Sequence, residues 1–206
     1  MRARHFYEPS KGHGLKHDPL NSIVAPRPIG WISTLSEEGK ANLAPYSFFN
    51  LFNYDPPIIG FSSQGLKDSL VNARSTSEFV WNLATRELAE AMNASSANVT
   101  AEIDEFVLAG LEKAPSNMVA PPRVAASPVQ FECLVTQIIR LKGKADEALE
   151  QWLVLGEAVG IHIDQGLIEG GIYRTSSARP IMRGGGLAGS AAGHLAAFRH
   201  CIYPGR

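Results

Sequence analysis

One continuous stretch, residues 25–70, constrains the fold of this chain more than any other part of the sequence. Two strand-like runs flank a turn at residues 36–40, and a small polar patch at residues 42–47 follows. A short strand then leads through a serine pair into a lysine and a further serine at the start of a helix. Hydroxyls, free backbone amides and a lysine are thus expected against strand ends, where they suit a planar ligand that bears a phosphate.

The rest of the chain continues as strands interrupted by short helical segments. Strands are expected at residues 29–35, 43–53, 58–61, 78–83, 129–141 and 152–163. Helices are expected at residues 66–75 and 85–94, with a helical turn near residues 104–108. Because strands and helices do not alternate regularly, we predict a mostly β protein with helical insertions. The expected architecture is a closed, antiparallel, Greek-key-like barrel rather than a Rossmann sheet.

Several local features follow from residue spacing. Leu66 and Leu70 lie four positions apart, which places them on one expected buried helix face. Thr85 is a suitable N-cap for the second helix. Gly156 and Gly160 interrupt the last long strand, which indicates β-bulges or a close approach of another part of the chain.

Composition excludes several classes of function. The chain has 206 residues and a formal net charge of −1, so no general attraction to nucleic acid or to a membrane surface is expected. No window approaches the run of about 18 apolar residues that a membrane-spanning helix requires. The polar N-terminus also lacks the apolar core of a signal peptide. We therefore expect a cytoplasmic protein.

The polar residues around the start of the first expected helix are candidates for phosphate binding. Ser62, Ser63, Lys67 and Ser69 would combine hydroxyl donors and a positive charge with the free amides and dipole of the helix. The same residue types also occur as an ordinary helix cap followed by a solvated face. Taken alone, the pattern favours that structural interpretation.

A planar ring would need hydrogen-bond partners along its polar edge. The backbone of residues 42–48 and the hydroxyls of Ser33, Thr34 and Ser47 are candidates, although such side chains are also common on barrel strands. Arg27 lies between two prolines, which favour an extended backbone that projects its guanidinium toward a phosphate. A surface arginine in a turn explains Arg27 equally well.

The histidines are weaker candidates for catalytic or metal-binding residues. His162 lies inside an expected strand and is a candidate catalytic residue on the face where a hydride donor would stack, although a lone strand histidine is more often structural. His5, His13 and His17 are interrupted by glycines in a segment that is unsuited to a stable helix. No cysteine or carboxylate stands at ligand spacing from them, so no metal site is expected.

The ordered motifs resemble the flavin reductase-like family, whose fold is the FMN-binding split barrel. The resemblance covers roughly residues 20–183 without large gaps. The matching motifs include Arg27-Pro28-Ile29, Asn42-Leu43-Ala44-Pro45-Tyr46-Ser47-Phe48-Phe49, Gly60-Phe61-Ser62, Lys67-Asp68-Ser69, Asp104-Glu105-Phe106 and Gly156-Glu157-Ala158-Val159-Gly160-Ile161-His162. The ordered set is specific for the family and less specific for a reaction.

The resemblance assigns roles that the residues alone leave open. It implies that Lys67, Asp68 and Ser69 bind the phosphate of the flavin. It favours Ala44, Ser47 and Phe48 as flavin contacts, and more weakly Asn42 and Thr34. Tyr46 stands where the family often has phenylalanine.

The resemblance also implies a cofactor and partners. It implies FMN rather than FAD, NAD(P)H as electron donor, and a homodimer with the flavin near the subunit interface. Electrons would pass to free flavin, a partner monooxygenase or another acceptor. A flavoredoxin-like FMN carrier or flavin-storage protein with little NAD(P)H oxidation is the main alternative. A barrel that has lost its ligand is a third possibility, which the intact segment of residues 62–69 disfavours.

Three regions are expected along the chain. Residues 1–20 form a loosely structured arm, and residues 21–183 form the barrel domain. Residues 184–206 form a glycine- and alanine-rich tail of low complexity, where the family usually continues with more ordered sequence.

Overall fold

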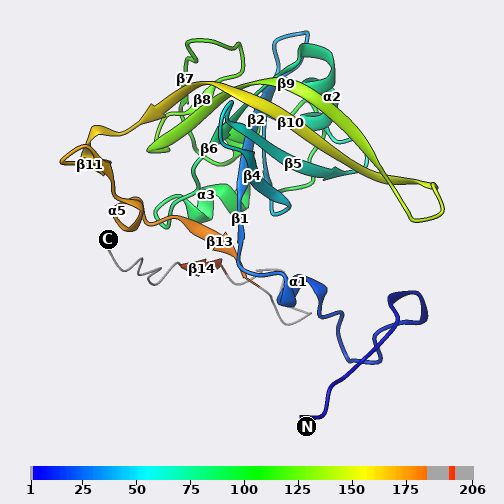
Figure 1. Cartoon of the computed structure of the whole chain (residues 1–206). Coiled ribbons are helices and arrows are strands. Elements are labelled where there is room, and N and C mark those ends of the chain that lie inside the picture. Colours follow the sequence, from blue (N-terminus) through cyan, green and yellow to red (C-terminus); the bar gives the residue numbers. More distant parts are fainter. Residues whose placement is uncertain (1, 185–194, 198–206) are drawn as a thin grey trace.

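The computed structural model describes residues 2–184 and 195–197 of the chain. Most of these residues belong to a curled antiparallel sheet with short helices around it, and an N-terminal arm extends away from the sheet (Figure 1). The predicted fold class, mostly β with helical insertions, is confirmed.

Seven strands form the main sheet in the order β3-β2-β6-β9-β10-β5-β4, and every neighbouring pair is antiparallel. Their bounds are β2 Gly30–Leu35, β3 Ala41–Tyr46, β4 Phe49–Asn53, β5 Ile58–Gln64, β6 Glu78–Asn82, β9 Val129–Lys142 and β10 Ala148–Ile163. Strands β3 and β4 are the two edges of this sheet, and β3 also contacts β5 across the curl. The sheet is therefore a split barrel, open between its edge strands.

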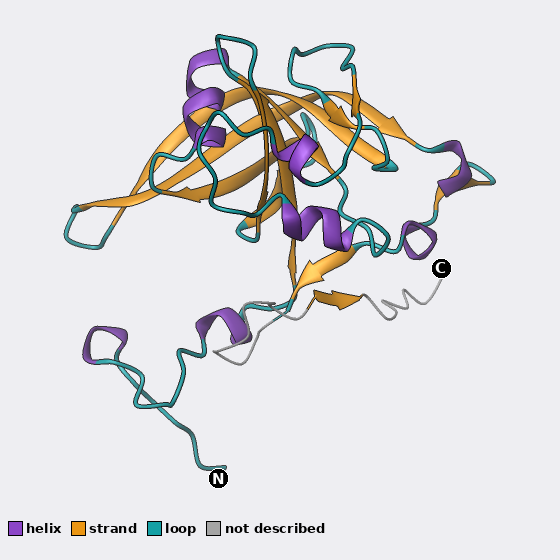
Figure 2. Cartoon of the chain, turned by 180° about the vertical axis from the view of Figure 1, so that it is seen from behind, coloured by secondary structure: helices purple, strands orange, loops and turns teal. Residues whose placement is uncertain are grey.

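Smaller elements surround the barrel (Figure 2). The helices are η1 Pro9–Lys11, α1 Leu20–Ile23, α2 Asp68–Thr76, α3 Ala89–Ala94, α4 Glu105–Leu108, η2 Gln165–Leu167 and α5 Thr175–Ala178. The minor strands are β1 Arg27–Pro28, β7 Lys113–Ala114, β8 Arg123–Val124, β11 Ile168–Glu169, β12 Ile172–Tyr173, β13 Ile181–Arg183 and β14 Leu195–Ala197. Helix α2 contacts β2, β3 and β6, which fixes the position of its first turn relative to the edge strand β3.

Aromatic side chains fill the barrel interior and require one glycine beside them. Phe61 and Phe79 are fully buried and meet edge to face, with ring centroids 5.5 Å apart. A Cβ atom on Gly156 would lie only 2.4 Å from the Phe79 ring, so this position needs glycine. The β9–β10 ladder shifts register beside Gly156 and again before Gly160. The predicted bulges and close approach are both present.

The single strand predicted at residues 43–53 is instead two strands. β3 ends at Tyr46 and β4 begins at Phe49, because the chain bends at Ser47 and Phe48 to pass from one edge of the barrel to the other. The Ser62 amide donates to the Phe48 carbonyl at 2.8 Å and holds this corner against β5. The corner therefore faces the start of the segment that leads into α2.

Two helix predictions were wrong in detail. Leu66 precedes α2 and is 60% exposed, whereas Leu70 is fully buried, so the two do not share a buried face. The second helix begins at Ala89 rather than near Thr85. Thr85 is instead buried in a β-bridge with Pro180, and it lies four residues before the helix, whose N-cap is Leu88.

The N-terminal arm lies outside the barrel (Figure 1). The arm predicted for residues 1–20 contains a single 3-10 turn and is mostly exposed. The predicted tail, residues 184–206, lies largely outside the described residues, apart from Gly184 and strand β14. In the described part of the chain, no helix combines the length and apolarity needed to cross a membrane.

Candidate functional site

A cavity of about 610 Å³ lies where the corner after β3, the end of β5 and the start of α2 meet. Its volume lies in the range of about 300–1,000 Å³ typical of cofactor sites. Eight residues that were predicted to bind a flavin line it: Asn42, Ala44, Ser47, Phe48, Ser62, Lys67, Asp68 and Ser69. The structure thus gathers most of the predicted residues from three separate elements around one space.

The end of the cavity beside α2 has the chemistry of an anion site. Lys67 is the N-cap of this nine-residue helix and has an extended backbone, so the chain enters the helix from the cavity wall. The first amides of a helix, here those of Asp68 and Ser69, have no partner within the helix. Together with Lys67 and the helix dipole, they favour a negatively charged group at this end.

A buried polar network supports that end from behind. The Asn42 side-chain amide donates to Ser69 Oγ at 2.8 Å and to Thr34 Oγ1 at 3.4 Å. Asn72 also donates to Thr34 Oγ1, at 3.1 Å. Thr34 is fully buried and is not among the residues that line the cavity. Its place is behind the wall, where it orients the side chains of Asn42 and Asn72.

Ser63 and Ser33 also lie away from the cavity surface. Both side chains are fully buried. Ser63 Oγ donates to the Gly65 carbonyl at 3.3 Å, within the turn that precedes α2. Ser33 Oγ donates to the Pro122 carbonyl at 2.6 Å and so ties β2 to the loop before β8. Neither serine is among the lining residues, and each has a backbone acceptor of its own.

Arg27 reaches the cavity only through the corner after β3. Its Nε donates to the Ser47 carbonyl at 3.1 Å, and its guanidinium lies 5.6 Å from the centre of the Phe48 ring. Nη1 donates to the carbonyls of Asn21 and Val24. Burial lowers the pKa of Arg27, and repulsion from a second arginine adds to this shift. These bonds make Arg27 a brace for the corner.

The structure places His162 outside the cavity. Its Nε2 bonds to the fully buried carboxylate of Glu132, which also accepts the backbone amides of Asn117 and Met118. Burial alone would raise the pKa of Glu132, but the bonds from Asn117, His162 and Met118 outweigh it and lower this pKa. His162 therefore belongs to a hydrogen-bonded cluster around Glu132, which also fixes the loop before β8.

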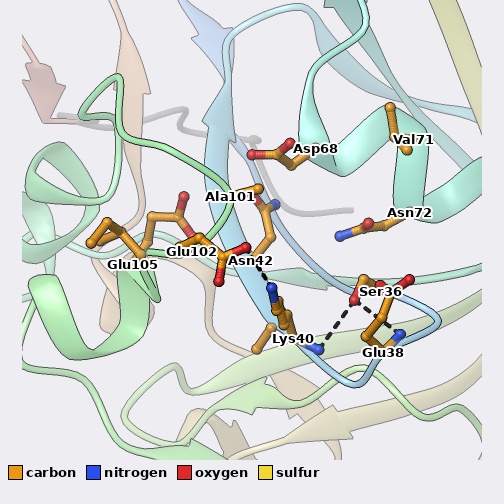
Figure 3. A pocket seen from close by; sticks show the side chains of 12 residues that line it. Ser36, Glu38, Lys40, Asn42, Asp68, Val71, Asn72, Ala101, Glu102 and Glu105 are labelled. Atoms are coloured by element: carbon orange, nitrogen blue, oxygen red, sulfur yellow. Dashed lines mark hydrogen bonds and ion pairs between the residues drawn. The ribbon is translucent and has the colours of Figure 1, made fainter.

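A smaller cavity of about 290 Å³ adjoins the first one and is strongly acidic (Figure 3). Asn42, Asp68 and Glu105 line both cavities, and Glu102 pairs with Lys40 at 2.6 Å. Glu105 is 6% exposed and accepts one bond, from the Leu43 amide at 3.1 Å. Burial raises the pKa of Glu105, and the nearby carboxylates of Asp68 and Asp104 add to the increase.

The sequence interpretation missed one whole wall of the larger cavity. Residues 95–99 and Ala101, between α3 and α4, line it together with Gln64, Leu66, Glu105 and Gln151. The run of small polar residues at 95–100 was a usable signal, because such side chains let a loop approach a ligand closely. Gln151 has no comparable local signal, since β10 brings it to Ser62 Oγ only through sheet pairing.

The donors around this cavity fit a planar cofactor that bears a phosphate. Positive charge, helix amides and hydroxyls gather at one end, and the aromatic corner of Ser47 and Phe48 lies along the same cavity. Tyr46 also lines the cavity, and its buried hydroxyl has no hydrogen-bond partner among the described residues. In the described part of the chain, no three His, Cys, Asp or Glu side chains are grouped so that they could hold a metal ion.

The curled sheet and this cavity define a split-barrel flavoprotein type of fold, and comparison with known proteins identifies the family. The family model described as "Flavin reductase like domain" matches residues 23–182. The chain therefore belongs to the flavin reductase-like family, which implies a flavin-related function. An uncharacterised protein from Aquifex aeolicus is 34% identical over 170 residues, which cover 80% of this chain and 83% of that protein. One from Halalkalibacterium halodurans is 35% identical over 169 residues, 80% of each chain.

Solved structures agree with this assignment. Nitrilotriacetate monooxygenase component B from Bacillus cereus superposes with a TM-score of 0.86 at 26% identity, over 98% of this chain and 99% of that one. A 2-nitrobenzoate 2-nitroreductase from Pseudomonas fluorescens gives a TM-score of 0.75 at 28% identity, over 89% and 87% of the two chains. Flavoredoxin from Desulfovibrio vulgaris shares the fold, with a TM-score of 0.76 at 15% identity, over 91% and 96%.

Proposed function

We propose that the protein binds FMN in the larger cavity and acts as an NAD(P)H-dependent flavin oxidoreductase. One observation carries the proposal: Lys67, the first amides of α2 and the hydroxyls of Ser62 and Ser69 converge at one end of a cofactor-sized cavity. This set suits a single phosphate group. The acidic residues of the adjoining cavity oppose a longer diphosphate chain there, which favours FMN over FAD.

Bound FMN would supply hydride and single-electron transfer. The residues of this chain would hold and shield it. Lys67 and Ser69 would bind the phosphate, while Ala44 and Phe48 would border the ring and exclude water from one side. Arg27 would keep the corner at Ser47 and Phe48 in place. The protein's contribution is thus to position the ring for an electron donor.

An absorbance spectrum of the purified protein with added FMN tests this proposal, before and after anaerobic NADH or NADPH. We expect a bound flavin spectrum that bleaches promptly, and the faster donor identifies the physiological nicotinamide. A bound flavin that persists in its oxidised form would favour the flavoredoxin-like carrier. If no FMN is taken up, the proposed cofactor site is wrong.

We also propose a homodimer with the flavin near the interface between subunits. The edge strand β4 exposes Leu51 and Phe52 at about half of their surface, and the adjoining Phe48 and Tyr54 are exposed as well. An uncovered apolar edge strand normally pairs with a partner. This apolar edge continues into the cavity wall at Phe48, so a second subunit would cover both. Light scattering after gel filtration should give the dimer mass, and a monomer would contradict the proposal.

A further inference from the structure

Tyr46 carries a buried hydroxyl group beside the larger cavity. Tyr46 is 7% exposed, it is among the residues that line the larger cavity, and its ring packs 4.7 Å from that of Phe61. Its hydroxyl has no hydrogen-bond partner among the described residues. A buried polar atom without a partner is costly and rare in proteins. Phenylalanine would fill the same space in the aromatic core without that cost, so the oxygen needs an explanation.

Two serine side chains neighbour this hydroxyl. The hydroxyls of Ser69 and Ser63 lie close to it. Ser69 Oγ already accepts a bond from Asn42, while Ser63 Oγ donates to the Gly65 carbonyl. Within the described residues, neither the Tyr46 proton nor the Ser69 proton has an acceptor. A cluster with spare protons is suited to an anion, which supplies acceptors and no donors.

The phenol keeps its proton at neutral pH and so remains a donor. Burial raises the pKa of Tyr46, and the negative charges of Asp68 and Glu105 add to the increase, while the hydroxyls of Ser69 and Ser63 partly oppose it. The same two carboxylates repel an anion in the cavity. Extra donors beside Lys67 are therefore needed there to offset that repulsion.

We propose that Tyr46 is a specificity-determining residue that acts through Ser69, so that the cavity prefers a flavin bearing a phosphate to the same flavin without one. The inference rests on the proposed function. When Ser69 donates its proton to a bound phosphate, the second lone pair of its oxygen can accept the Tyr46 proton beside the Asn42 amide. Tyr46 then strengthens the bond from Ser69 to the anion, because each bond in such a chain polarises the next. In the free protein, by contrast, the Tyr46 hydroxyl has no hydrogen-bond partner among the described residues.

The substitution Tyr46→Phe tests this inference because two measurements should move in opposite directions. Titration with FMN and with riboflavin, followed by flavin fluorescence, compares ligands that differ only in the phosphate. We expect FMN affinity to fall about 3- to 10-fold, as for one lost hydrogen bond, with less than a twofold change for riboflavin. The melting temperature of the free variant should rise by about 2–4 °C, because the unpartnered hydroxyl is gone.

Two further variants complete the experiment. Tyr173→Phe removes a hydroxyl from a partly exposed residue outside the cavity and should leave both affinities unchanged. In a Ser69→Ala background, Tyr46→Phe should cause no further loss of FMN affinity, because the two residues act as one unit.

Three results would overturn the inference alone. These are an unchanged FMN affinity in Tyr46→Phe, equal losses for FMN and riboflavin, and a lower melting temperature of the free variant. The last result would mean that the hydroxyl already has a partner before a ligand binds. Wild-type protein that binds neither flavin would overturn the proposed function as well, so the two failures can be distinguished.

Discussion

Two buried glutamates, in different regions of the barrel, differ in how completely their carboxylates are hydrogen-bonded. Glu132 on β9 is fully buried and accepts bonds from Asn117, Met118 and His162. Glu105, at the start of α4, is almost as buried but accepts a single hydrogen bond from another element, the Leu43 amide. The pKa of Glu132 is accordingly lowered, and that of Glu105 is raised.

The difference separates a structural region from a candidate binding region. Around Glu132, the amides of Asn117 and Met118 tie the loop before β8 to the barrel, and His162 adds a third partner, so the carboxylate needs no ligand. Glu105, by contrast, lines two cavities, and its negative charge adds to the raised pKa of the unpartnered Tyr46 hydroxyl. Incompletely satisfied polar groups are costly, and proteins retain them mainly where a ligand or a reaction uses them.

The largest expected effect is on stability, from Glu132→Ala. The change leaves two backbone amides and His162 without their acceptor in a buried position. We expect a loss of about 3–5 kcal/mol in the free energy of unfolding, as for a broken buried pair. Urea unfolding of this variant measures the loss, and Glu112→Ala, at an exposed position, is the matched control. A loss below about 1 kcal/mol, typical of surface changes, would remove the contrast between the two glutamates.

The second effect is on ligand binding, from Lys67→Ala. Lys67 is exposed at the N-cap of α2, so its loss should change stability by no more than about 0.5 kcal/mol. We expect FMN affinity to fall about tenfold, as for one charge-assisted bond to phosphate. Lys144→Ala, on the exposed hairpin between β9 and β10, removes the same charge away from the cavity. Unchanged FMN affinity in Lys67→Ala would refute the assignment of the phosphate end.

A smaller effect is expected from Glu105→Gln, which should increase both stability and FMN affinity. The amide oxygen of glutamine can still accept the Leu43 amide, while the poorly solvated negative charge disappears. At neutral pH the variant should be more stable by about 0.5–1 kcal/mol, in the range of single stabilising substitutions. FMN affinity should rise about two- to fivefold because one repulsive charge near the phosphate end is removed. Lower stability would show that the Glu105 carboxylate is better satisfied than its contacts indicate.

The smallest effect is a pair of opposite pH dependences. The raised folded-state pKa of Glu105 means that its contribution to stability is lost as pH rises above the usual range for glutamate. The lowered pKa of Glu132 means that its contribution is lost as pH falls below that range. The stability gain of Glu105→Gln over wild type should therefore grow with rising pH.

Glu132→Gln should show the reverse pattern, because its penalty relative to wild type should shrink as the solution becomes more acidic. Urea unfolding between about pH 4 and about pH 8 measures both differences. If the stability differences of the two variants from wild type change with pH in the same direction, the carboxylates do not differ in the way their hydrogen bonds imply.

Much of the barrel was predictable because strands leave a local signal. Alternating apolar residues located β2, β5 and β6, and the glycines of β10 indicated where the ladder shifts register. The break between β3 and β4 left no such signal. Its apolar run continues through Phe48, and the bend exists because the two strands belong to opposite edges of the sheet. The start of α2 was placed two residues early, since Leu66 fits a helical pattern that the chain does not follow.

The candidate site was likewise predictable only in part from the sequence. The sequence by itself determined the family, the mostly β fold and the gathering of Asn42, Ser62 and Lys67 around one cavity, because these features depend on short runs of neighbouring residues. Only the tertiary structure decided which side chains reach the cavity. Thr34 faces buried partners, and Glu105 comes from α4, far along the chain. A local pattern shows that side chains alternate between two faces, but the packing of distant segments determines what each face meets.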